Sequence, residues 1–260
     1  MPKLIKKILK LVLHFENWPL RFLELMHLAP KKLLKMSLRN GTIFFVRAYS
    51  SDISCLQSIT MENEYFPYFN VMPGDTVIDI GANIGSFSVS VAYREPSAKI
   101  YAIEPVKNNY NLLCQNIELN HLTNVSPINV AISDKREELT IYHGLGSWFA
   151  SGSFYKVDAT DPHSSEEVSC ITLEDIFIEN EIGNCDFLKM DCEGAEYKIL
   201  FSLSDELLRK IKKIAIEFHN FESDNKQHDI VKFLESKQYR VILPRKYQNK
   251  EIGLVFAIKQ

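Results

Sequence analysis

Short apolar runs alternate with longer segments of helical periodicity along most of this chain of 260 residues. The apolar runs are typical of strands buried on both faces of a parallel sheet, and they fall at 76–80, 98–103, 125–132, 186–190 and 214–218. Helical segments follow at 86–94, 108–119, 171–178, 196–203, 205–212 and 229–237, and two late strands at 240–243 and 253–258 could pair. This alternation predicts an α/β fold: a doubly wound, Rossmann-like, mostly parallel seven-stranded sheet with helices on both faces.

The segment at 3–15, KLIKKILKLVLHF, has a different pattern. Its apolar residues recur at helical spacing and its lysines lie on the opposite side, which predicts an amphipathic basic helix. The segment is too short to span a bilayer, and its lysines interrupt the apolar stretch that a secretory signal needs. Two interpretations stay open. The helix contacts an anionic membrane surface, or it packs its apolar face on the protein body or another subunit, which is the commoner arrangement.

A break at 72–75, MPGD, divides the chain. We predict an N-terminal extension over 1–70, with a strand pair element at 41–49 and a helix over 51–70, and a main domain over 71–260. A further strand is predicted at 139–142. The stretch 143–166 is rich in Gly, Ser and Asp, and we interpret it as a mobile loop or hairpin that carries Trp148, Phe149, Phe154 and Tyr155.

Charge and cysteine usage limit the partners and the compartment. Residues 1–40 hold nine Lys/Arg and two acids, whereas the other 220 residues hold 21 Lys/Arg and 31 acids. An acidic body repels a phosphate backbone, so no nucleic-acid partner is expected unless the basic N-terminal arm captures one. The five cysteines are scattered, without a C-x-x-C pair, which argues against disulfides and structural zinc. We expect a cytoplasmic protein, peripheral to the membrane if the first helix binds lipid.

Polar residues stand at the ends of four predicted strands: Gly81, Glu104, Asp191 and His219. Ligands of such sheets bind beyond the carboxyl ends of the strands. The first of these ends, DIGANIG at 79–85, lacks the glycine spacing of the dinucleotide fingerprint, because its third and sixth positions from Gly81 are Asn83 and Ser86. Asn tolerates a positive φ and can replace a glycine for a ligand without a diphosphate.

Glu104 ends the second strand, 19 residues after Gly85. A carboxylate at this place accepts hydrogen bonds from ribose hydroxyls, although it could also simply cap the helix that follows. Asp79 precedes the turn, where it could orient backbone amides, meet an ammonium group of the ligand, or serve the structure alone.

The segments VIDIGANIGSFSV, NVAISD, ITLEDIF and DFLKMDCEGAE together resemble the FkbM family of class I S-adenosylmethionine-dependent methyltransferases. They run from Val77 to Glu196, about half of the chain, and the last is the most specific when combined with TLED. The resemblance implies a class I methyltransferase domain and S-adenosylmethionine as cofactor. It also implies an acceptor hydroxyl on a sugar, a lipid or a secondary-metabolite-like product, and the loop over 143–166 would face that substrate.

The resemblance further implies a cofactor site. The residues expected to shape its methionine side are Asp79, Gly81, Asn83 and Gly85, and Ala82 and Asp191 are also expected to bind the cofactor. Glu104 is expected to hold the ribose, and Ala131 and Asp134 to border the adenine.

Methyl transfer to a hydroxyl needs a group that receives the proton. We predict Asp191, Glu193 and His219 as the catalytic residues, since they follow the fourth and fifth strands and His has an ordinary pKa suited to a base at neutral pH. Glu193 and Glu196 could instead complement a helix dipole, and His219 could be a structural histidine. The acids and His219 could also hold a divalent metal, but no metal is predicted. Lys189 could meet a ligand carboxylate or form a salt bridge.

Two alternatives to a methyltransferase remain from the sequence. One is a protein that binds the adenosyl cofactor without turnover, because a fold alone does not establish a reaction. The other is an NAD-type oxidoreductase, which the glycine spacing disfavours.

Overall fold

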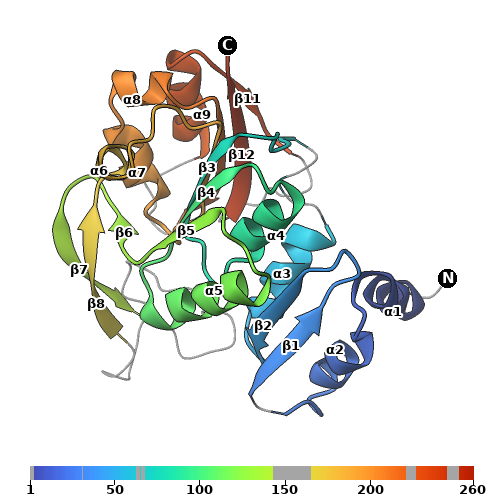
Figure 1. Cartoon of the computed structure of the whole chain (residues 1–260). Coiled ribbons are helices and arrows are strands. Elements are labelled where there is room, and N and C mark those ends of the chain that lie inside the picture. Colours follow the sequence, from blue (N-terminus) through green and yellow to red (C-terminus); the bar gives the residue numbers. More distant parts are fainter. Residues whose placement is uncertain are drawn as a thin grey trace.

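A seven-stranded sheet forms the centre of the molecule, with the strand order β11-β12-β10-β9-β3-β4-β5 (Figure 1). The computed structural model describes residues 3–30, 32–62, 65, 68–142, 165–220, 227–244 and 252–260. The sheet contains β3 (Thr76–Ile80), β4 (Lys99–Ile103), β5 (Val125–Ile128), β9 (Phe187–Met190), β10 (Lys213–His219), β11 (Tyr239–Ile242) and β12 (Ile252–Lys259). Neighbouring strands are parallel except that β12 runs antiparallel to both β10 and β11. The predicted mostly parallel sheet and the pairing of the two late strands are confirmed.

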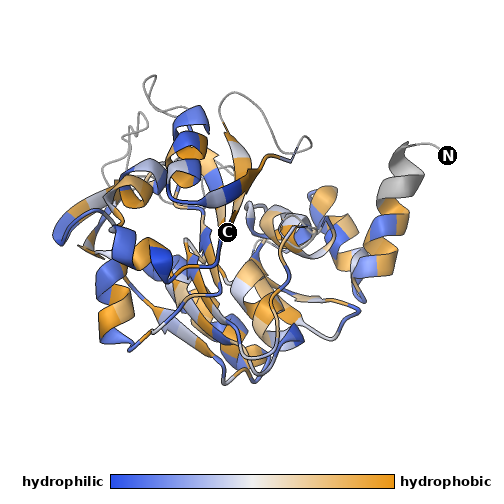
Figure 2. Ribbon diagram, turned by 90° about the horizontal axis from the view of Figure 1, so that it is seen from above, coloured by the Kyte–Doolittle hydropathy of each residue, from blue (hydrophilic) through white to orange (hydrophobic). Residues whose placement is uncertain are grey.

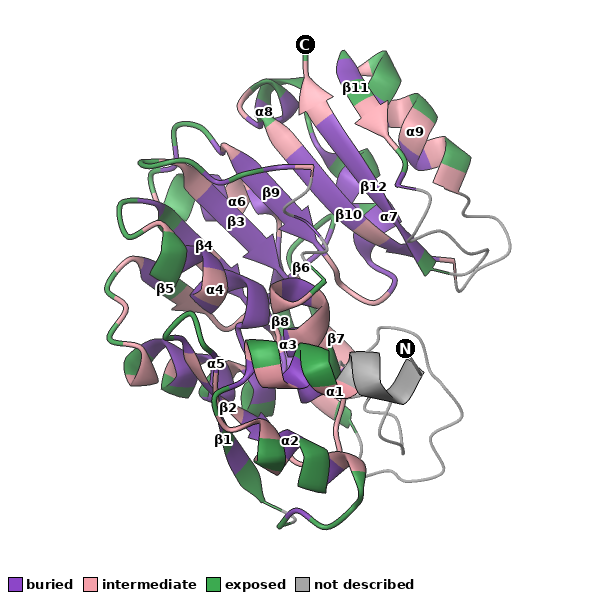
Figure 3. Ribbon diagram, turned by 90° about the vertical axis from the view of Figure 1, so that its right-hand side faces the viewer, coloured by how far each residue is buried: buried purple, intermediate pink, exposed green. Residues whose placement is uncertain are grey.

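Both faces of this sheet are buried, which explains why its strands are continuous apolar runs. Val77 belongs to one buried hydrophobic cluster and its neighbour Ile78 to another, because successive strand residues point to opposite faces. The first cluster includes side chains of α3 (Asp52–Thr60), α4 (Ser86–Arg94) and α5 (Lys107–Leu119). The second includes side chains of α6 (Leu173–Glu179), α7 (Glu196–Ser202), α8 (Asp205–Arg209) and α9 (Gln227–Ser236). Figure 3 shows β3, β9, β10 and β12 mostly in the colour of buried residues, whereas the edge strand β11 is largely intermediate.

The single strand predicted over 125–132 is wrong, because the chain leaves the central sheet after β5. The side-chain amide of Asn129 donates hydrogen bonds to the backbone oxygens of Glu104 and Pro105, and this marks the break. The next residues, Ala131–Ile132, form β6 in a separate three-stranded sheet of order β6-β8-β7. Its other strands are β7 (Glu137–Tyr142) and β8 (Ser165–Ile171). Residues 143–164 of the predicted loop over 143–166 lie outside the described residues. The last two residues of that range, 165 and 166, begin β8.

The N-terminal elements pack on the main sheet through the first hydrophobic cluster. They are α1 (Lys3–His14), α2 (Trp18–Leu25) and the antiparallel hairpin of β1 (Leu33–Ser37) and β2 (Ile43–Arg47). Asn116 of α5 and Asn120, which directly follows this helix, hydrogen-bond to backbone groups of β2, which attaches the hairpin to the body. The helix predicted within 51–70 is shorter than expected and ends at Thr60. The boundary at residue 70 stays a prediction.

Helix α1 uses one face for packing and leaves the other in solvent. Leu11 and Phe15 are buried in the first cluster, as the packing interpretation expected, whereas Leu9 and Leu13 are exposed. Figure 2 shows hydrophobic and hydrophilic residues alternating around this helix next to the N-terminus. Within the described residues, none of the helices has the length and apolar character that crossing a bilayer requires.

Candidate active site

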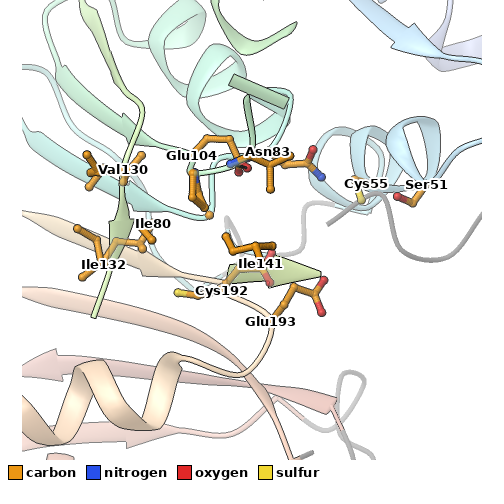
Figure 4. A pocket seen from close by; sticks show the side chains of 16 residues that line it. Ser51, Cys55, Ile80, Asn83, Glu104, Val130, Ile132, Ile141, Cys192 and Glu193 are labelled. Carbon is orange, nitrogen blue, oxygen red and sulfur yellow. Dashed lines mark hydrogen bonds between the residues drawn. The ribbon is translucent and has the colours of Figure 1, made fainter. Parts of the chain in front are cut away.

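A cavity of about 790 Å³ opens at the carboxyl ends of β3, β4 and β9 (Figure 4). Parallel strands bring these ends to one edge of the sheet, which is where doubly wound folds bind ligands. The side chains and backbone that line the cavity are Ser51, Cys55, Ile80, Gly81, Asn83, Ile103, Glu104, Pro105, Val106, Val130, Ala131, Ile132, Ile141, Asp191, Cys192 and Glu193. One side is therefore polar and acidic, and another is formed by aliphatic residues of β6 and β7.

The turn after β3 has left-handed backbone at Gly81, Asn83 and Gly85, with φ of 78°, 51° and 88°. At Gly81 a Cβ atom would lie 1.8 Å from the backbone oxygen of Asp191, so only glycine lets the two strand ends come together. Asn83 adopts the positive φ that its residue type allows. This turn accordingly presses against the end of β9 and leaves the side chain of Asn83 at the cavity.

Glu104 joins the turn to the end of β4 and is nearly inaccessible to solvent. Its carboxylate accepts hydrogen bonds from the backbone N–H of Asn83 at 2.8 Å and of Val106 at 2.9 Å. Burial raises the pKa of Glu104 to about 7, although these two hydrogen bonds partly oppose the shift. Glu104 thus braces the turn and also faces the cavity, so both predicted interpretations of this residue have a structural basis.

Two buried oxygens beside the turn lack a hydrogen-bond partner among the described residues. They are Oδ1 of Asn83 and Oγ of Ser86. A buried polar atom without a partner is costly, and Asn83 lines the cavity whereas Ser86 does not, so Oδ1 of Asn83 suits a ligand that brings a hydrogen-bond donor. S-adenosylmethionine carries two ribose hydroxyls and an ammonium group, all of which donate hydrogen bonds. A cavity with acidic hydrogen-bond acceptors on one side and aliphatic side chains on another fits such a molecule.

Asp79 lies beneath the turn and is absent from the cavity lining. Its carboxylate pairs with the ammonium group of Lys189 at 2.9 Å and accepts a hydrogen bond from Ser88 at 2.6 Å. Burial by itself would lower the pKa of Lys189, but the charges of Asp79 and Asp191 more than offset it, so the pKa lies above its usual value. Lys189 forms the internal salt bridge that was one of its two predicted roles.

Behind the cavity, Glu196 connects the loop after β9 to His219 at the end of β10. Its side-chain oxygens accept hydrogen bonds from the backbone N–H of Cys192 at 2.7 Å and of Gly194 at 3.0 Å. One of them also lies 3.1 Å from Nδ1 of His219. Glu196 therefore fixes the loop that carries Asp191 and Glu193, which is a structural role.

His219 lies between two carboxylates, with Nε2 at 3.5 Å from Glu193 and Nδ1 next to Glu196. Burial alone would lower the pKa of His219, but the hydrogen bond and charge of Glu196, together with Glu193 and Asp191, raise it to about 10. A histidine with this pKa is already protonated at neutral pH. Both ring nitrogens of His219 thus face carboxylates, and its predicted role as a base stays a prediction.

Ligand-type atoms of Asp191, Glu196 and His219 lie within 4.8 Å of one another, a spacing that a divalent cation can bridge. Both oxygens of Glu196 already accept backbone N–H groups, and its Oε1 also meets His219. A cation would have to displace these contacts. We interpret the cluster as an ion-pair network.

The remaining predicted residues fall into two groups. Ala131 lines the cavity, as do Gly81, Asn83, Glu104, Asp191 and Glu193. Asp134 does not line it; its carboxylate pairs with Lys198 at 3.0 Å. Ala82 and Gly85 belong to the turn after β3 but are also absent from the cavity lining. The four aromatic residues predicted to face the substrate, Trp148, Phe149, Phe154 and Tyr155, lie outside the described residues.

Ser51 and Cys55 are lining residues that the sequence analysis did not find. They come from the start of α3 within the N-terminal region, and Figure 4 shows them beyond Asn83 at one end of the cavity. No motif marks them, because their place depends on how α3 packs against α4 and β2. The aliphatic side chains of Val130, Ile132 and Ile141 were likewise missed, although the predicted strands contained them.

Comparison with known proteins identifies the family to which this chain belongs. The profile described as "Methyltransferase FkbM domain" matches residues 79–241, which is more than half of the chain and includes every predicted site residue. This chain belongs to the FkbM methyltransferase family. Its cofactor is S-adenosylmethionine, so the predicted family and cofactor are confirmed, and the oxidoreductase alternative is not favoured.

Individual relatives are distant. The chain is 25% identical over 196 residues to 31-O-demethyl-FK506 methyltransferase FkbM of Streptomyces tacrolimicus, covering 65% of this chain and 74% of the relative. It is 31% identical over 148 residues to a tRNA(Phe) (4-demethylwyosine(37)-C(7)) aminocarboxypropyltransferase of Methanocaldococcus jannaschii, covering 54% and 55%. The crystal structure of methyltransferase FkbM from Methylobacillus flagellatus KT superposes with a TM-score of 0.51 at 16% identity, covering 81% of this chain and 55% of that one, which supports the fold.

Proposed function

We propose that this methyltransferase transfers the methyl group of S-adenosylmethionine to a hydroxyl oxygen of a sugar, lipid or secondary-metabolite-like acceptor. The observation that carries the proposal is the presence of two carboxylates, Asp191 and Glu193, in the same cavity as Glu104. A hydroxyl acceptor releases a proton during methylation, and a carboxylate in the cavity can receive it. The Streptomyces relative, whose name describes a methyltransferase for an O-demethyl product, supports an oxygen acceptor.

Each described residue of the proposed site has its own role. Glu104 and Asn83 would hold the ribose, and the aliphatic wall around Ala131 would border the adenine. When bound, S-adenosylmethionine supplies a methyl group made electrophilic by its positively charged sulfur. Asp191 would receive the hydroxyl proton of the acceptor, and protonated His219 would keep Glu193 turned toward the cavity. Asp79 and Gly81 would shape the site from below without touching the acceptor.

Glu104 provides a test of the cofactor site. The change Glu104→Ala is expected to weaken binding of S-adenosylhomocysteine by about 1–3 kcal/mol, because charge-assisted hydrogen bonds to the ribose are lost. For the wild type, affinity should also fall as pH is lowered through about 7, since the raised pKa of Glu104 means that the accepting carboxylate is protonated there. Calorimetric titration over a pH series measures both effects.

Two controls accompany this titration. The variant Glu104→Gln keeps the side-chain size and should lose the pH dependence that comes from this group. The variant Asp134→Asn should bind like the wild type, because Asp134 pairs with Lys198 outside the cavity lining. Unchanged affinity in Glu104→Ala would place the ribose elsewhere.

The proposal also includes that the acceptor is not a nucleic acid. The support is the acidic body, with 31 acids against 21 Lys/Arg in residues 41–260, which disfavours a phosphate backbone. The relative that acts on tRNA(Phe) by its name makes RNA the acceptor to exclude experimentally. Methyl transfer to bulk RNA, with none to glycosides or lipids, would contradict the proposed acceptor class. Cofactor binding without any transfer would favour the non-catalytic alternative.

We also propose that α1 brings this protein to an anionic membrane surface within the cytoplasm. The exposed face of α1 combines Leu9 and Leu13 with Lys10, and residues 1–40 carry a strong excess of positive charge. Apolar side chains next to basic ones suit the boundary between lipid headgroups and acyl chains. The packed face of α1 would stay on the protein body.

Vesicle sedimentation checks this contact. The wild type is expected to bind phosphatidylcholine vesicles only when they contain phosphatidylglycerol, and to be released by salt, because the attraction is screened. The double variant Leu9→Gln/Leu13→Gln should lose most of the binding. Ile178→Gln changes an aliphatic residue on α6 that is even more exposed than Leu9 and Leu13, and it should leave the binding intact. Equal binding by the double variant would refute a role for α1.

A further inference from the structure

A second cavity lies beside the cofactor cavity, between α2 and the start of α3, and has a volume of about 720 Å³. Ser51 lines both cavities, so the two are neighbours at the N-terminal end of α3. On α3 itself, Cys55 lines the first cavity and Ser54 the second. A molecule that occupies the second cavity is therefore placed to extend past Ser51 toward Asp191 and the cofactor.

The walls of this second cavity contain backbone that residues other than glycine rarely adopt. His27 and Tyr49 have φ of 57° and 62°, and their rings stack with centroids 5.2 Å apart at an angle of 8°. Left-handed backbone at such bulky residues is costly and concentrates where a site must be shaped. Here it places two stacked rings at the rim of one cavity. The backbone N–H of Tyr49 donates to Glu24, and its hydroxyl donates to the backbone oxygen of Ala29, so the ring is fixed.

The floor of the cavity is polar but electrically balanced. Arg21 and Glu24 form a buried ion pair, and Arg21 also donates to Gln57 at 3.1 Å. The Nε of Arg21, in a side chain only 8% exposed, has no hydrogen-bond partner among the described residues. A donor left without a partner in a buried place suits a ligand that offers an acceptor oxygen. The hydroxyl groups of Ser50, Ser51 and Ser54 add further donors and acceptors.

We propose that this second cavity binds a neutral, polyhydroxylated six-membered ring, as the part of the methyl acceptor next to the reactive hydroxyl. The inference rests on the proposed function, because it identifies where that acceptor lies. Balanced charge disfavours an anionic or cationic ligand. Stacked rings offer a flat apolar face to the C–H face of a sugar, and the serines, Arg21 and Glu24 can pair with its hydroxyls.

Saturation-transfer NMR with methyl glucoside and methyl galactoside, on the full chain saturated with S-adenosylhomocysteine, tests this site. The wild type should transfer saturation to at least one of the two glycosides. Ser54→Trp fills the second cavity from an exposed position on α3 and should reduce the transfer about tenfold or more, since a blocked pocket excludes the ring. Ser236→Trp, at the end of α9 and away from the site, should behave as the wild type.

A second variant and a cofactor-binding control distinguish failure of the proposed site from failure of the proposed reaction. His27→Asn removes one of the stacked rings at an exposed position and keeps a residue type that tolerates positive φ, so it should weaken the signal without lowering the melting temperature. All variants should bind S-adenosylhomocysteine like the wild type. No transfer to either glycoside, or equal transfer in Ser54→Trp, would overturn the proposed site. Glycoside binding that Ser54→Trp removes, with no methylation of any acceptor by the wild type, would support the site and contradict the proposed reaction.

Discussion

Replacing Lys189 by methionine is expected to lower the free energy of unfolding by about 3–5 kcal/mol, the usual cost of leaving one partner of a buried ion pair alone. The side chains of Lys189 and Asp79 are 4% and 0% exposed, and their charged atoms lie 2.9 Å apart. Without the lysine, the carboxylate of Asp79 would keep only the hydrogen bond from Ser88 as a described side-chain contact. Urea denaturation of the free protein measures the loss.

Two further variants show whether the cost comes from the unpaired charge. Lys189→Met/Asp79→Leu removes both charges and should recover much of the stability, because burying apolar groups in place of an ion pair is often neutral. Lys210→Met breaks the exposed pair with Glu206 and should have no measurable effect. A single Lys189→Met variant as stable as the wild type would mean that the Asp79 carboxyl is protonated or reached by water.

The central sheet could be predicted because its residues obey a rule that is local in sequence. Each of its buried strands is a short apolar run, and Val77 and Ile78 pack into different clusters on the two faces. The ends of these strands meet by geometry, so Gly81, Glu104 and Asp191 arrive in one cavity without further information. The strand over 125–132 was mispredicted because the break at Asn129 depends on hydrogen bonds to the distant end of β4.

The protonation state of His219 could not be predicted from its place in the sequence. An isolated histidine titrates near neutral pH, but here the carboxylate of Glu196 lies 3.1 Å away across the gap between α7 and β10. That neighbour is 23 residues distant in the chain, and its effect on the pKa depends on the burial of both groups. Sequence spacing identifies which charges are available, whereas packing decides which of them meet.

The N-terminal wall of the site could not be predicted from the sequence for a related reason. Ser51 and Cys55 carry no recognisable motif, and the preceding region was predicted as an extension outside the main domain. Their position results from the packing of α3 on α4, together with Asn116 of α5, which holds the β2 backbone. The second cavity, whose stacked rings come from residues 27 and 49, is a property of that packing alone.

Asp191→Asn is expected to reduce the rate of methyl transfer by about 10²–10⁴-fold, the range that loss of a positioned general base produces. The amide is nearly the same size as the carboxylate but cannot take up a proton at neutral pH. Asp191 lines the cavity, and its backbone oxygen packs under Gly81, so the side chain is held by the same contact that shapes the turn. Binding of S-adenosylhomocysteine should change little, because the variant leaves Glu104 and the turn intact.

The measurement is the rate of S-adenosylhomocysteine formation at saturating cofactor, with an acceptor found by screening glycosides and lipids for methyl incorporation. Glu206→Gln, which alters an exposed carboxylate on α8, serves as the matched control and should keep full activity. Glu193→Gln distinguishes the two acids of the cavity: a smaller loss than in Asp191→Asn is expected, because Asp191 is the proposed base and Glu193 pairs with His219 at 3.5 Å. Full activity in Asp191→Asn together with an inactive Glu193→Gln would transfer the role of base to Glu193, and His219 would then act by holding that base in place.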